Sequence, residues 1–134
     1  MPKRALIFVI VCCIGCAINN VDSRPFVFDN EVAIKDSLMH VIKFDSIQFE
    51  ETAHSENEIL TTEFNITIIN PQPFPTDSLK LYSIARPIAI IAKKNIDNPR
   101  KYNVFRVDFY SEEEIGIGIL RTRKTIHFNE YDLN

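Results

Sequence analysis

Charged side chains alternate with apolar ones near the carboxyl end of the chain, where Phe105, Val107 and Phe109 follow a period of two. Successive residues of a strand face opposite ways, so the charged residues between them are expected on the other face, together with residues of the next strand. Guanidinium groups present forked donors to planar anions, so this face is a candidate for binding a carboxylate or a phosphate. Its residues are Arg106, Asp108, Arg121, Arg123 and His127.

The same pattern has a second interpretation without a ligand. An exposed sheet face carries cross-strand pairs such as Asp108 with an arginine, each contributing roughly 0.2 to 1 kcal/mol. Both interpretations stay open at this point. The sequon Asn65-Ile66-Thr67 is likewise expected to present its asparagine to solvent from another strand.

Other residue types with chemical potential are scattered. The acidic clusters Glu50-Glu51 and Glu112-Glu113-Glu114 could form an acid/base pair or a cation site. Both stand where strands are expected to meet turns, where solvated carboxylates discourage edge pairing. The histidines His40, His54 and His127 show no metal-ligand spacing. We therefore predict no catalytic residue set, no metal site and no cofactor.

The amino-terminal segment has the layout of a secretory signal peptide. Lys3 and Arg4 precede the uninterrupted apolar run Ala5 to Ile14. Even the wider stretch Ala5 to Ile18 reaches only about 21 Å as a helix, against a hydrocarbon core of about 30 Å. The run is therefore too short to span a bilayer comfortably, and export is the preferred interpretation.

All three cysteines, Cys12, Cys13 and Cys16, lie in this segment, so the exported body has no disulfide framework. The residues Cys13-Ile14-Gly15-Cys16 resemble the lipobox of bacterial lipoproteins. The resemblance implies that Cys16 is lipidated on its sulfur and becomes the new N-terminus, so that acyl chains hold the protein at a membrane. Ordinary signal cleavage after Ala17 is the alternative that the residues leave open.

Composition limits the classes of partner. The 134 residues carry a net charge of -3, and losing Lys3 and Arg4 with the signal gives a body of net charge -5. The chain has no block of basic residues and no nucleic-acid-binding motif, so nucleic acid is not expected as a partner.

Periodicity locates the main elements of the body. A short helix is expected from Glu31 to His40, strands over Val41 to Glu50 and Leu60 to Ile68, and strands from 104 to 110 and from 115 to 128. Glu51 to Glu58 is expected to be a loop, and Ser111 to Glu114 a turn. A main helix, capped by Thr76 or Asp77, is expected to run to about Asn95, and Pro87 is expected to kink or split it.

Two hairpins separated by a helix predict an α+β fold of two layers. The expected arrangement is an antiparallel ββαββ sheet with one main kinked helix on one face, after an N-terminal signal segment. The predicted division is a signal peptide at 1–15, a tether at 16–30 and a single domain at 31–134.

These features predict a small exported, lipid-anchored binding protein of the bacterial cell envelope that is not an enzyme. Its partner would be an envelope protein or a small anionic ligand. The lipid anchor would be its contact with the membrane. Without lipidation the protein would be soluble in the periplasm or secreted. Two other functions remain open, an exported small hydrolase whose site is not visible in one dimension and an inhibitor or immunity-type protein.

Overall fold

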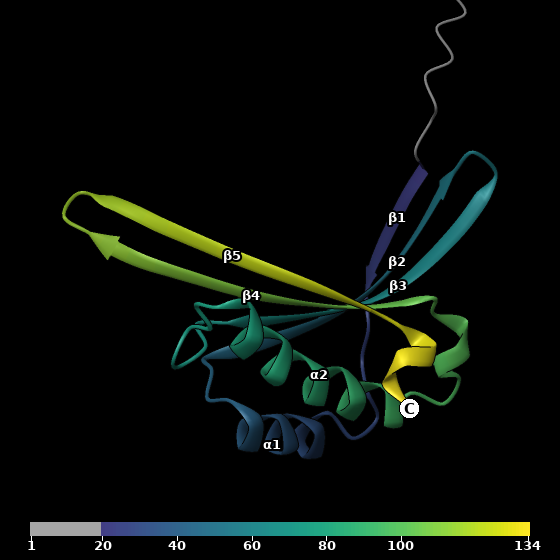
Figure 1. Ribbon diagram of the computed structural model, residues 1–134, viewed down its shortest axis with the longest axis horizontal. Helices are drawn as coiled ribbons and strands as arrows, with labels where there is room; N and C mark the ends of the chain where they lie inside the picture. The colour runs from purple at the N-terminus through teal and green to yellow at the C-terminus, as the bar shows by residue number, and fades with distance from the viewer. Residues whose placement is uncertain (1–19) are drawn as a thin grey trace, which may run out of the picture.

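The computed structural model describes residues 20–134 (Figure 1). Five strands and two α-helices form the fold, with short 3-10 turns after α2 and at the carboxyl end. In chain order the elements are β1 (Asn20–Pro25), α1 (Glu31–Val41), β2 (Ser46–Glu56), β3 (Ile59–Ile69), α2 (Ser78–Lys94), the turn η1 (Pro99–Lys101), β4 (Val104–Ile115), β5 (Gly118–Asn129) and the turn η2 (Glu130–Leu133).

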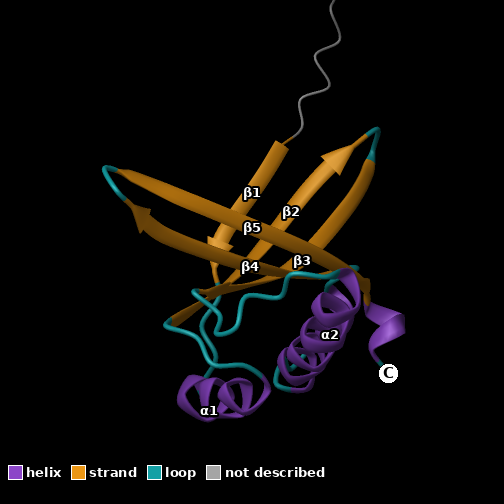
Figure 2. Cartoon of the chain, turned by 60° about the vertical axis from the view of Figure 1, so that its left-hand side comes forward, coloured by secondary structure: helices purple, strands orange, loops and turns teal. Residues whose placement is uncertain are grey.

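The strands form one mixed sheet in the order β1-β2-β3-β4-β5. Strands β3 and β4 run parallel, and every other neighbouring pair is antiparallel. Parallel neighbours need a crossover connection, which here contains α2. The predicted two-layer antiparallel ββαββ arrangement with one main kinked helix is therefore wrong. The sheet is mixed, it has an additional strand, and both helices lie on the same side of it (Figure 2).

The additional strand β1 comes from the segment expected to be a tether. Asn20 pairs with Ser55 and Pro25 with Glu50, so β1 is the edge strand beside β2. Its polar sequence shows no apolar alternation, and Pro25 at its end is tolerated because an edge strand needs few donors.

Helix α2 forms one continuous helix in spite of Pro87. Asp77 caps it, since its carboxylate accepts a hydrogen bond from the backbone N–H of Lys80 at 2.8 Å. The expected split at Pro87 does not occur, because the helix is held against the sheet by buried small residues on either side of the proline, among them Ala85 and Ala89.

The core fills the space between the middle of the sheet and the two helices. Phe64 is fully buried at its centre, where ring centroids of five other aromatic residues lie between 5.0 and 6.2 Å from its own. Edge-to-face and tilted rings at these distances pack favourably. The five neighbours are Phe26, Phe28, Phe49, Tyr102 and Phe105.

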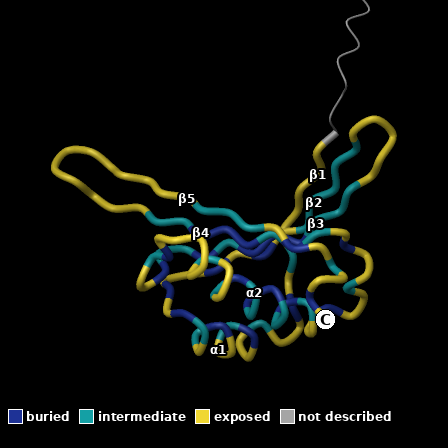
Figure 3. Tube along the Cα trace, in the orientation of Figure 1, coloured by how far each residue is buried: buried dark blue, intermediate teal, exposed yellow. Residues whose placement is uncertain are grey.

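Both hairpins are longer than predicted. The expected loop from Glu51 to Glu58 contains the outer half of β2, and the expected turn from Ser111 to Glu114 lies within β4. The outer parts of the hairpins diverge beyond the helices, and their ends are exposed (Figures 1 and 3). The open sheet between these arms is therefore the surface that can present side chains to another molecule.

Candidate functional site

The side of β4 and β5 that points away from the helices, here called the open face, brings together the five residues of the predicted anion-binding face. The register pairs Arg106 with His127 and Asp108 with Thr125. Farther out it pairs Tyr110 with Arg123 and Glu112 with Arg121. Alternate residues of paired strands share one face, so all eight side chains lie in two rows on the open face.

At the inner end of the open face, Asp108 is buried and its carboxylate is satisfied within the protein. Arg106 binds it with two nitrogens, Nη2 at 2.8 Å and Nε at 3.2 Å, and the Thr125 hydroxyl donates to the same carboxylate. Only 3% of Asp108 is exposed. Because both oxygens have donors and the fork of Arg106 is occupied, this part of the predicted site stabilises the sheet.

At the outer end, Glu112 forms a network with its neighbours. The Tyr110 hydroxyl donates to Glu112 Oε2 at 2.6 Å, and Arg121 Nε donates to the same oxygen at 3.2 Å. These bonds, first that from Tyr110 and then that from Arg121, hold the pKa of Glu112 below its ordinary value. The Glu112 carboxylate raises the pKa of Tyr110 and of Arg121 in return. The side chain of Arg121 remains 63% exposed.

Arg123 is the arginine of the open face with the fewest internal contacts. Its guanidinium carbon lies 5.5 Å from the centroid of the Tyr110 ring, a distance that suits a cation–π contact. Within residues 20–134 it has no carboxylate partner at ion-pair distance. Arg123 and His127 are both exposed. The accessible part of the predicted site therefore consists of Arg121, Arg123 and His127.

Sequence reasoning missed the role of Asn65, which lies on β3 beside Arg106. It was expected to face solvent, yet only 7% of it is exposed. Its Nδ2 donates to Thr52 Oγ1 at 2.7 Å, while its Oδ1 has no partner among the described residues. Asn65 lies on the central strand β3 between β2 and β4, and its burial depends on side chains from other strands, which no local sequence signal reports.

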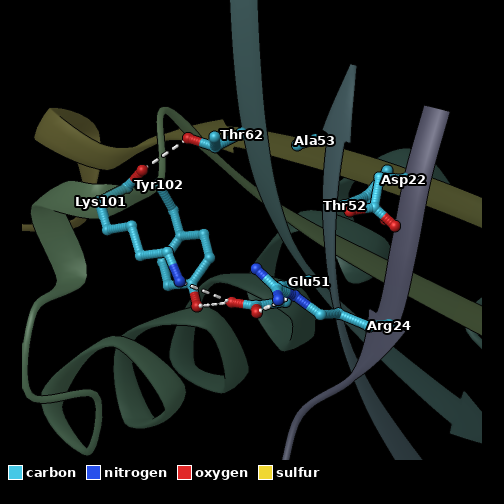
Figure 4. Close-up of a pocket in the computed structure, with 8 residues that line it drawn as sticks. All are labelled: Asp22, Arg24, Glu51, Thr52, Ala53, Thr62, Lys101 and Tyr102. Carbon is cyan, nitrogen blue, oxygen red and sulfur yellow. Dashed lines mark hydrogen bonds and ion pairs between the residues drawn. The ribbon is translucent and has the colours of Figure 1, made fainter. Parts of the chain in front are cut away.

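A second polar cluster, the Glu51 cluster of Arg24, Glu51, Lys101 and Tyr102, lines a small cavity of about 100 Å³ (Figure 4). The Tyr102 hydroxyl and Lys101 Nζ donate to Glu51 Oε2 at 2.6 and 2.9 Å. Arg24 Nε lies 2.5 Å from Oε1. The cluster thus joins the edge strand β1 to β2 and to the segment that follows α2.

Electrostatics make Glu51 a poor acid or base. The bonds from Tyr102 and Lys101 lower its pKa, and burial together with the bond to Glu51 raises the pKa of Tyr102. A general base needs an oxygen able to accept a substrate proton, whereas both Glu51 oxygens already face donors. No histidine lines this cavity. The Glu51 cluster therefore has the chemistry of a structural clamp.

Residues 20–134 offer neither a cluster of metal ligands nor a membrane-spanning helix. No group of three or more histidine, cysteine or acidic side chains in that range could hold a metal ion. None of the helices described there is both long and apolar enough to cross a membrane. The predicted signal peptide and Cys16 lie outside the described residues.

Comparison of this chain with known proteins identifies no related protein. Searches against protein-family models, curated proteins and solved structures found no match. A function must therefore be inferred from the residues of this chain alone.

Proposed function

We propose that this protein is an exported, lipid-anchored binding domain of the cell envelope that holds an anionic group of another envelope component on its open face. The observation that carries the proposal is the state of Arg123. Its guanidinium is stacked on Tyr110, is exposed, and has no carboxylate partner within the described chain. A planar, partly oriented guanidinium with unused donors suits a carboxylate or a phosphate.

The neighbours of Arg123 support the same ligand chemistry. Arg121 uses one nitrogen on Glu112, and its side chain is largely exposed. His127 lies on the same strand and the same face. Arg106 takes no part, because its Nε and Nη2 hold the buried Asp108 carboxylate. The proposed contact is therefore confined to the exposed residues of β5 on the open face.

The net negative charge of the body means that an anionic group can be held only by short-range contacts. The body has a net charge of -5 once the signal is removed, so a distant anion gains no general attraction. An anionic group that binds must do so through short-range hydrogen bonds with the two arginines. This favours a shape-dependent partner over a nonspecific polyanion.

The test uses photo-crosslinking in the native envelope. In one variant, a photoreactive residue replaces His127 on the open face. In a second variant, the same photoreactive residue replaces Val32, which is 75% exposed on α1. We expect an adduct with an envelope component from position 127 only. The double change Arg121→Ser with Arg123→Ser should abolish that adduct.

A matched control removes two positive charges from the helix side. The double change Lys35→Ser with Lys94→Ser alters the net charge equally and should leave the adduct in place. Equal adducts from positions 127 and 32, or an adduct that survives loss of both arginines, would contradict the proposal.

A further inference from the structure

We propose that the end of the β4–β5 hairpin inserts into the interfacial layer of the lipid bilayer to which the protein is anchored. This apolar tip consists of Ile115, Gly116, Ile117, Gly118, Ile119 and Leu120. The inference rests on the proposed function in one respect, the lipid anchor at Cys16. It adds a second membrane contact that the anchor alone does not require.

The apolar tip exposes aliphatic side chains that nothing in the described chain covers. Ile117 is fully exposed at the turn, and at least half of Ile115, Ile119 and Leu120 is exposed. Gly116 adopts φ +59°, which lets the chain reverse tightly. Four large aliphatic side chains at one projecting end form a contact site, since single exposed residues are ordinary but a contiguous group is not.

The shape of the tip favours a soft partner. It is a narrow convex hairpin end, and no cavity described in residues 20–134 includes its residues. A convex apolar end buries most of its surface in a fluid partner that can surround it, and lipid is such a partner.

The place where the chain enters the sheet identifies that medium as the bilayer. Asn20 pairs with Ser55, next to the β2–β3 turn. Cys16 precedes Asn20 by four residues, so an extended chain spans at most about 14 Å between them. An acylated Cys16 therefore brings the start of β1 close to the membrane surface.

The apolar tip lies on the same side of the molecule as the start of β1. Figures 1 and 2 differ by a turn about the vertical axis, which preserves height in the picture. In both views the two hairpin ends and the start of β1 lie above α1 and α2. A membrane that holds the start of β1 can thus also meet the apolar tip, with both helices directed away from it.

Charge and backbone chemistry set the depth of insertion. The tip itself carries no charge, while three acidic and three basic side chains follow it on the two strands, Glu112, Glu113, Glu114, Arg121, Arg123 and Lys124. Their balance makes insertion nearly independent of lipid charge. The turn leaves backbone polar groups without strand partners, so the tip belongs at the interface and not in the hydrocarbon core.

The test measures the environment of the apolar tip in the mature protein, purified from its own membrane and reconstituted in phosphatidylcholine vesicles. The sequence has no cysteine after Cys16, so Ile117→Cys provides a single thiol for an environment-sensitive fluorophore. We expect a blue-shifted emission, quenching by lipids with a quencher on the acyl chain, and protection from aqueous iodide. Vesicles with added anionic lipid should give the same result.

Val32→Cys on α1 is the control. Val32 is an exposed aliphatic residue like Ile117, with 75% of it exposed, but it lies on the helix side. Its label should be quenched by iodide and not by the lipid quencher. In a protein labelled at Ile119→Cys, the change Ile117→Asp should return the label to water, whereas Val32→Asp should not. These variants alter only exposed positions and are expected to fold.

The intact mass of the same sample separates the two claims. A protein without acyl chains on Cys16 would refute the proposed anchor. An acylated protein whose label at 117 is as accessible to iodide as the label at 32 would refute insertion alone. Protection at 117 that appears in native membranes but not in protein-free lipid vesicles would show that the tip docks on a protein, and would also refute insertion.

Discussion

Replacing Glu51 by alanine should destabilise the protein and loosen β1, the strand into which the proposed anchor leads. Glu51 accepts a hydrogen bond from the Tyr102 hydroxyl and binds Lys101 and Arg24. Tyr102 is only 2% exposed, so the variant leaves a covered hydroxyl without its acceptor. Arg24 at the same time loses the side-chain contact that supplements the backbone pairing of β1 with β2.

The size of the effect follows from these contacts. A hydrogen bond to a charged acceptor contributes about 1.5 to 3 kcal/mol. The two ion pairs add little, about 1 kcal/mol or less each, because the side chains of Arg24 and Lys101 are 64% and 49% exposed. We expect Glu51→Ala to lower the free energy of unfolding by about 3 kcal/mol, which lowers Tm by about 10 °C for a chain of this size.

The assay is chemical denaturation of the mature protein, repeated for Tyr102→Phe and for the double variant. Removing either partner breaks the same bond, so the double variant should be only slightly less stable than Glu51→Ala. Glu50→Ala, on the opposite face of β2, is the control and should change stability by no more than about 0.5 kcal/mol. Additive losses, or a Glu51→Ala protein as stable as the original, would refute the clamp.

The lowered pKa of Glu51 also fixes the direction of a pH effect. A carboxyl group with a depressed folded pKa stabilises the protein above its unfolded pKa, near about 4.3, and loses that contribution as the pH falls through the folded value. The difference in stability between the original protein and Glu51→Ala should therefore be full at about pH 7 and shrink below about pH 4.

Three other perturbations test the open face and α2. Arg106→Ala leaves the buried Asp108 carboxylate without its cation. The free energy of unfolding, measured in urea, should fall by about 3 to 5 kcal/mol. A fall of less than about 1 kcal/mol would contradict the buried ion pair. Pro87→Ala restores an intrahelical hydrogen bond and should raise the free energy of unfolding by about 1 kcal/mol or more; a less stable variant would show that packing of the proline ring outweighs that bond. Tyr110→Phe removes the strongest influence on Glu112, so the carboxyl pKa of Glu112, followed by NMR, should rise toward its ordinary value; an unchanged midpoint would exclude the bond.

The sequence carried enough information to find most of the elements. The alternation from Leu60 to Ile68 and from Phe105 to Phe109 marked inner strands, because most of its apolar residues face a continuous core. Leu60, at the outer end of β3, is the exception and is exposed. The apolar stripe on the main helix was visible for the same reason. Each of these signals comes from burial of one side of one element.

Sheet topology could not be read from the same signals. An antiparallel and a parallel neighbour of β3 bury the same alternate residues, so the pattern of β4 does not reveal its direction. The sequence pattern does not predict strand β1, because an exposed edge strand has no buried side and therefore no apolar alternation. The outer parts of β2 and β4 were also missed, because their polar residues mark no buried side. The outer parts of β3 and β5 were included in the predicted strands.

The open face was predicted as a group but not in its internal pairing. Parity alone places Arg106, Asp108, Arg121, Arg123 and His127 on one side of two paired strands. Which arginine meets which carboxylate depends on register, and that is set by the turn at Gly116 to Gly118. Only the register separates the occupied Arg106 from the accessible Arg123.

The proposal that an acylated Cys16 holds this binding domain at a membrane has one decisive test, the intact mass of the mature protein recovered from its native membrane. We predict a chain that begins at Cys16 and carries the added mass of acyl chains. A chain that begins at Ile18, or one that retains Met1, would overturn the proposal.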